Sequence, residues 1–190
     1  DNLSSRKECS KWGGKMYCQE PENTLKSLQH AIDLFDGIEF DIRMTSDNQL
    51  IVHHDRNVSV KKSRLHGKSE WVESWKLEDL ESEGFLPFRA MLEDPTIRSN
   101  WIEKGKMGCI EIKRPHPNAP MGGGFLSRKK HNNHIANIIK LADEILDEFE
   151  EYNAPVYHLQ DEMVTAASNA VRDLAIKKLQ AVGAMGTGPN

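Results

Sequence analysis

The sequence lacks any apolar run close to the ~20 residues that a transmembrane helix needs. It has only three cysteines in 190 residues, an odd number that disfavours a dense disulfide framework. It also lacks an excess of positive charge, because its net charge of -4 offers no electrostatic basis for binding nucleic acid or an anionic membrane. These absences predict a soluble globular protein, with the cytoplasm favoured and a secreted or periplasmic location left open.

Acidic residues alternate with apolar residues in one segment of the chain. Glu39 and Asp41 are spaced i, i+2, so on a strand both side chains lie on the same face. A second segment repeats the pattern, with Cys109, Glu111 and Lys113 on one face. Carboxylates that point into a protein are costly unless they bind something, and a hard divalent cation prefers oxygen ligands. The two segments indicate a cation that holds a phosphate, with a simple ion pair between Glu111 and Lys113 as the alternative.

A histidine–aspartate pair follows a short apolar run. Leu50–Val52 has the composition of a buried strand, and His53, His54 and Asp55 come directly after it. His54 can transfer protons near neutral pH, and Asp55 is placed to influence it. His53 points to the opposite face and is expected to be structural. Together with the carboxylates and the lysine, the pair indicates a metal-dependent phosphodiesterase site.

These motifs resemble those of the glycerophosphodiester phosphodiesterases, from about residue 13 to residue 115. The resemblance consists of a loop, a strand, a turn, a catalytic pair and a second strand: Pro21-Glu22-Asn23-Thr24, Glu39 with Asp41, Thr45 with Asp47, His54-Asp55 and Glu111-Ile112-Lys113. It implies a TIM barrel that hydrolyses a phosphodiester with one bound divalent cation, Mg²⁺ or Ca²⁺.

The resemblance also implies a role for each residue of the site. The cation ligands would be three carboxylates: Glu39, Asp41 and Glu111. His54 would act as acid or base, and Lys113 would stabilise the negative charge of the phosphate. Glu22 would either orient a phosphate-binding group or only hold its loop in place.

The chain departs from this family at the first catalytic motif. The family opens with His-Arg-Gly at the end of its first strand, whereas this chain has Lys11-Trp12-Gly13. One of two proton carriers and one phosphate anchor are therefore absent. Lys11 would have to replace the histidine, and an ordinary lysine is a poor base at neutral pH because it is protonated.

Hydrophobic periodicity predicts alternating strands and helices in a single domain over residues 1–190. Residues 1–20 make a poor strand, and the better strands are 38–44, 50–52, 107–113 and 155–159. Helices are expected over 24–36, 77–83, 88–93, 127–152 and 163–182. This order gives about four βα units, whereas a complete TIM barrel usually takes ~250 residues. The barrel is therefore truncated or incomplete: it is minimal or fragmentary, or a second copy completes it as a homo-oligomer, or a longer chain does.

Two functions from different classes account for the motifs. The first is a hydrolase of glycerophosphodiesters or related lipid-derived phosphodiesters. The second is a catalytically impaired relative that still binds a divalent metal and a phosphate ester. A bare scaffold is disfavoured, because it has no need of five buried polar groups on one mouth. Both functions imply a small phosphodiester as the partner.

Overall fold

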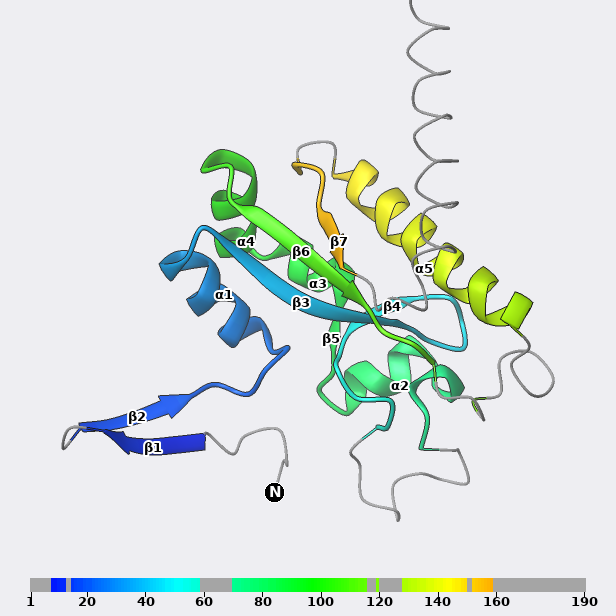
Figure 1. Cartoon of the computed structure of the whole chain (residues 1–190), viewed down its shortest axis with the longest axis horizontal. Coiled ribbons are helices and arrows are strands. Elements are labelled where there is room, and N and C mark those ends of the chain that lie inside the picture. Colours follow the sequence, from blue (N-terminus) through cyan, green and yellow to red (C-terminus); the bar gives the residue numbers. More distant parts are fainter. Residues whose placement is uncertain are drawn as a thin grey trace, which may run out of the picture.

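The structure, a computed structural model, describes residues 8–12, 15–58, 70–115, 119, 128–149 and 152–158. Its main element is a five-stranded sheet with the strand order β5-β4-β3-β6-β7 (Figure 1). The bounds of these strands are β3 (Gly37–Met44), β4 (Leu50–Val52), β5 (Leu86–Pro87), β6 (Met107–Ile112) and β7 (Val156–His158).

The sheet combines a parallel segment with an antiparallel edge. β3 and β6 are parallel, as are β6 and β7, whereas β4 is antiparallel to β3 and β5 is antiparallel to β4. The turn between β3 and β4 is too short for a parallel crossover, which needs a dozen or more residues. The predicted α/β class with a parallel segment is confirmed. β4 forms a hairpin with β3 through the polar turn at Thr45 and Asp47, so it is not part of a βα unit.

Helices and helical turns follow the strands. Their bounds are α1 (Leu25–Leu34), η3 (Val72–Ser74), α2 (Leu77–Ser82), α3 (Phe88–Glu93), α4 (Pro95–Arg98), η4 (Ser99–Glu103) and α5 (Arg128–Glu148). Four predicted helices correspond to α1, α2, α3 and α5. The predicted helix over 163–182 lies outside the described residues. No helix in the described ranges is both long and apolar enough to cross a membrane.

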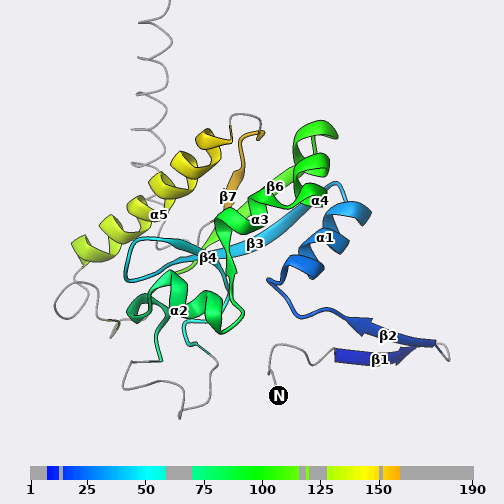
Figure 2. The ribbon, with the colours of Figure 1, turned by 180° about the vertical axis from the view of Figure 1, so that it is seen from behind.

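One face of the sheet is apolar and packs against the helices. Phe40 and Ile42 from β3 and Ile110 from β6 are buried in a core that also contains Phe88 of α3 and Ile138 of α5. Seen from behind, α3 and α4 lie in front of the sheet (Figure 2). This packing follows from the alternation along each strand, which sends every second side chain into the core.

The opposite face of the sheet is polar. Glu39, Asp41 and Arg43 alternate with the buried apolar residues of β3. The register places Asp41 beside Glu111 of β6, and Glu111 beside His158 of β7. Three neighbouring parallel strands thus present their polar side chains in one row.

A separate two-stranded sheet precedes this body. β1 (Glu8–Trp12) and β2 (Lys15–Gln19) pair with each other in antiparallel fashion and form no part of the five-stranded sheet. Figure 1 shows this hairpin to one side of β3 and β6. The predicted poor strand over residues 1–20 is therefore two short strands that do not join the main sheet.

The packing of β6 on η4 predicts the effect of a methyl group at Gly108. A Cβ atom there would lie 2.1 Å from two ring atoms of Trp101, whose side chain is fully buried. Gly108→Ala should therefore lower the free energy of unfolding by about 1–3 kcal/mol or more, measured by urea denaturation. In a Trp101→Leu background the same change should cost less, because the ring is gone. Equal costs in both backgrounds would contradict the packing.

Candidate active site

A lysine joins two acidic residues at the centre of the polar face. Lys113 Nζ lies 2.9 Å from Asp41 Oδ1 and 2.5 Å from Glu111 Oε1. Both Asp41 and Lys113 are buried, at 5% and 8% exposure. The predicted ion pair and the predicted site are thus not exclusive, since the lysine holds two carboxylates at a fixed separation.

The charges of this cluster shift two pKa values. Burial acts to lower the pKa of Lys113, but its hydrogen bonds to Glu111 and Asp41 outweigh burial, so the pKa is raised and the ammonium stays charged. Burial raises the pKa of Glu39, and the nearby charges of Asp41 and Glu111 raise it further. Lys113 therefore does not neutralise the cluster, which retains an excess of negative charge.

The Pro-Glu-Asn-Thr loop supports the cluster through its asparagine. Asn23 adopts a left-handed backbone conformation with φ 55°, which asparagine tolerates better than most residues. Its side-chain nitrogen donates to Asp41 Oδ2 at 2.7 Å, and its side-chain oxygen accepts from the Asp41 backbone N–H at 3.0 Å. Thr24 then caps α1 by accepting from Ser27 N–H. The sequence pattern marked this loop but assigned its role to the neighbouring Glu22.

The structure places the histidine–aspartate pair just beyond β4. His54 Nδ1 lies 3.0 Å from Asp55 Oδ1, and both side chains are exposed. The hydrogen bond from His54 lowers the pKa of Asp55, which keeps this carboxylate ionised and able to accept. Nδ1 then carries the shared proton, and Nε2 of the neutral ring is left as a base. His53 instead packs edge-on against Phe85 and is structural, as predicted.

A buried ion pair behind His54 connects the ends of β4 and β6. Arg43 Nη1 lies 3.3 Å from Glu73 Oε1, with both side chains almost fully buried. The same guanidinium donates from Nη2 to the His54 backbone oxygen at 2.9 Å and from Nη1 to that of Arg114 at 2.9 Å. Removing one partner of such a pair leaves a buried, uncompensated charge, so Glu73 holds Arg43 in place. The hydrogen bond from Arg43 in turn constrains the backbone at His54.

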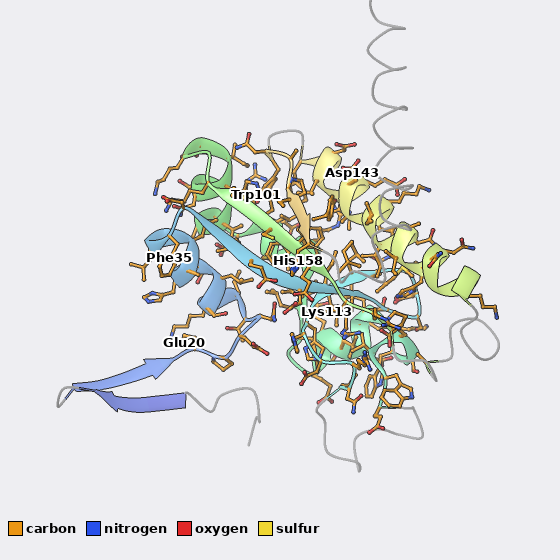
Figure 3. All side chains as sticks on the ribbon, in the orientation of Figure 1. Glu20, Phe35, Trp101, Lys113, Asp143 and His158 are labelled. Carbon is orange, nitrogen blue, oxygen red and sulfur yellow. The ribbon has the colours of Figure 1, made fainter. Side chains whose placement is uncertain are left out.

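Three side chains of the polar face, two of them exposed, could together hold a metal ion. Ligand atoms of Glu39, Glu111 and His158 all lie within 4.8 Å of one another. His158 Nδ1 also lies 3.5 Å from Glu111 Oε2, and Lys113 and His158 are labelled in Figure 3. Carboxylates and imidazole are common ligands of divalent cations, so the donor set fits such a cation. Of the expected ligands Glu39, Asp41 and Glu111, this group contains two.

The structure places three residues in positions that the sequence alone did not indicate. His158 was not assigned a role from sequence, because only the pairing of β7 with β6 brings it to Glu111. Glu22 is exposed, and Asn23 rather than Glu22 contacts Asp41. Lys11 lies in β1, opposite Met16 of β2, and the structure does not bring that strand into the sheet that carries the carboxylates. The roles of Glu22 and Lys11 stay predictions.

A sequence profile of the glycerophosphoryl diester phosphodiesterase family matches residues 13–182. The chain belongs to this family. The match begins at Gly13, immediately after Lys11 and Trp12. In the search of curated proteins, no significant match was found.

Solved glycerophosphodiester phosphodiesterases resemble the chain in fold. The enzyme from Parabacteroides distasonis superposes with a TM-score of 0.50 at 19% identity, over 74% of this chain and 51% of the other. Those from Agrobacterium tumefaciens (TM-score 0.49, 18% identity, 80% and 58% coverage) and Thermotoga maritima (0.42, 18%, 83% and 64%) are further similar structures. The chain thus spans about half to two thirds of the length of these structures, in agreement with the predicted partial barrel.

The like charges around Glu39 predict a pH dependence of stability. The pKa of Glu39 is raised in the folded state. The contribution of Glu39 to the stability of the fold is therefore fully present below its pKa in the unfolded chain, and it is lost as the pH rises through its pKa in the folded chain. Without metal, Glu39→Gln should therefore gain Tm relative to the parent protein between pH 4 and pH 7, measured by differential scanning fluorimetry in EDTA.

The same variant tests the metal site. Mg²⁺ or Ca²⁺ should raise the Tm of the parent protein at pH 7, because a ligand of the native state stabilises it. Glu39→Gln should abolish that rise, whereas Glu144→Gln, which removes an exposed carboxylate of α5, should retain it. A metal-induced rise that survives in Glu39→Gln would overturn the assignment of Glu39.

Proposed function

We propose that the protein is a metal-dependent phosphodiester hydrolase acting on glycerophosphodiesters or related lipid-derived phosphodiesters. Membership of the family supports the substrate class. The observation that carries the proposal is the convergence of Glu39, Glu111 and His158 on the face where Lys113 is held by Asp41 and Glu111. Such a constellation suits binding of a phosphate through a cation and an ammonium group.

The cation site uses Glu39 and Glu111, with Asp41 and His158 as candidates for the third ligand. When bound, Mg²⁺ or Ca²⁺ would neutralise the non-bridging phosphate oxygens. Asp41 is already engaged by Lys113 and Asn23, whereas His158 lies beside Glu111. An imidazole ligand would shift the preference from Mg²⁺ or Ca²⁺ toward transition metals.

Proton transfer belongs to His54 in this proposal. Its Nδ1 is engaged by Asp55, so Nε2 is left to act as acid on the leaving oxygen and then as base on the attacking water. The neighbouring hydroxyl of the glycerol attacks phosphorus and gives a cyclic phosphate, which water then opens. Lys113, kept protonated by its two carboxylate partners, stabilises the added negative charge on the phosphate. Lys11 stands where the family has its first histidine and would have to replace it in proton transfer at the other reacting oxygen.

The second candidate is a catalytically impaired relative that binds the same cation and phosphate ester. It is favoured by Lys11 and Trp12, which replace the histidine and arginine of the first motif. Hydrolysis of glycerophosphocholine, followed by choline release with Mg²⁺, Ca²⁺ or chelator, distinguishes the two candidates. Metal-dependent release supports the hydrolase, and ligand binding without release supports the impaired relative.

Replacement of His54 tests the mechanism. His54→Ala should lower kcat by ~10²–10⁴-fold, the usual contribution of general acid–base catalysis. His30→Ala is the matched control, because His30 is an exposed histidine on α1 and should leave turnover unchanged. Undiminished turnover in His54→Ala would exclude His54 as the proton carrier.

Restoring the motif of the family tests Lys11 and Trp12. If the protein is active, Lys11→His with Trp12→Arg should raise kcat, by up to ~10²–10⁴-fold, because a better base and a phosphate anchor are added. Steady-state kinetics of the parent, the two single variants and the double variant measure the gain. An inert parent with an active double variant supports the impaired relative, whereas a lower rate in the double variant contradicts the equivalence of Lys11 with the histidine of the family.

A further inference from the structure

A hollow beside the carboxylate cluster is rich in positive charge. It has a volume of about 510 Å³, and four cationic side chains line it: Arg43, Arg56, Lys113 and Arg114. Asp55 is its single acidic lining residue, and His54 also lines it. Within the described part of the chain, the hollow therefore carries an excess of positive charge, which suits an anionic ligand.

The positive charge is not equally available along the hollow. Arg43 is paired with buried Glu73, and Lys113 is paired with Asp41 and Glu111. Asp55 is engaged by His54. Of the four cations that line the hollow, Arg56 alone has an exposed side chain, so the positive charge most accessible to a ligand lies toward Arg56.

The backbone holds Arg56 in place although its side chain is exposed. Its carbonyl oxygen accepts from Val72 N–H at 3.1 Å, and the next residue, Asn57, forms a bridge with Trp71. A guanidinium on a fixed backbone can bind a phosphate with two parallel hydrogen bonds at lower entropic cost than one on a mobile chain.

The hollow adjoins the proposed phosphate position but does not coincide with it. None of the three carboxylates of the cluster lines it, whereas Lys113 and His54 belong to both. A diester whose phosphorus lies at the carboxylates and Lys113 would therefore direct the substituent on the His54 side toward Arg56. With His54 as acid for the leaving oxygen, that substituent is the alcohol that departs.

We propose that this hollow binds a second anionic group, so that the preferred substrates are phosphodiesters whose alcohol itself carries a phosphate. The inference rests on the proposed function for the position of the scissile phosphate. It goes further by assigning Arg56 as a specificity-determining residue. Guanidinium groups favour such an alcohol and disfavour a cationic one such as choline.

A matched pair of ligands tests this proposal by binding, independently of turnover. Glycerophosphoinositol and glycerophosphoinositol 4-phosphate differ only by the added phosphate. Isothermal titration calorimetry with the full chain should show at least ~10-fold tighter binding of the phosphorylated compound, since a hydrogen bond between charged groups contributes about that much. Equal affinities, or no binding of either compound, would overturn the proposal.

Two variants that each remove one positive charge test whether Arg56 is responsible for the tighter binding of the phosphorylated compound. Arg56→Gln should reduce the affinity ratio of the two compounds about 10-fold, toward one. Lys140→Gln removes the same charge from an exposed site on α5 and should leave the ratio unchanged. An unchanged ratio in Arg56→Gln would overturn the role of Arg56, and circular dichroism verifies that the variant is folded.

Hydrolysis of the same pair separates this inference from the proposed function. Preferential binding without hydrolysis of either compound supports the hollow and contradicts the hydrolase. Hydrolysis of both with equal kcat/KM and equal affinity supports the hydrolase and contradicts the hollow. Vesicles with phosphatidylinositol 4-phosphate distinguish a lipid from a soluble diester: Arg56-dependent binding of either source supports the proposal, and binding of neither overturns it.

Discussion

The ion pairs of Lys113 with Asp41 and Glu111 are the interaction on which the rest of the site depends. Carboxylates on neighbouring strands repel one another, and the charges of Asp41 and Glu111 add to the burial that raises the pKa of Glu39. A buried ammonium group between two of them makes the arrangement tolerable in the folded chain. The excess of negative charge that remains is what a cation would neutralise.

The polar cluster lies next to the apolar core because the two faces of the sheet differ. The side chains of Phe40 and Ile42 in β3 point toward the helices, and those of Asp41 and Arg43 point to the opposite face. In a complete barrel the helices surround the outside, so the face opposite them lines the interior. The polar row of this chain therefore lies on the face that corresponds to the barrel interior in its relatives, of which the chain spans only part.

Supporting residues connect the site to distant parts of the chain. Asn23 fixes Asp41 from a loop that precedes α1, and Arg43 ties the segment after β4 to the segment after β6. Arg43 and Glu73 are both buried, so this tie contributes more to geometry than to stability. The positively charged hollow adjoins the same contacts of Arg43, which places its positive charge next to His54.

The local sequence pattern predicted the strands and the motifs of this protein, whereas contacts between distant segments decided which residues meet at the site. Alternation in the segments around Asp41 and Glu111 predicted the strands and which residues share a face, because side-chain direction in a strand is a local property. The motifs likewise predicted the family and the His54–Asp55 pair. The position of His158 required the pairing of β7 with β6, and the role of Asn23 required a contact across 18 residues. Spatial neighbours that are distant in sequence leave no periodic signal, so only the tertiary structure could place them.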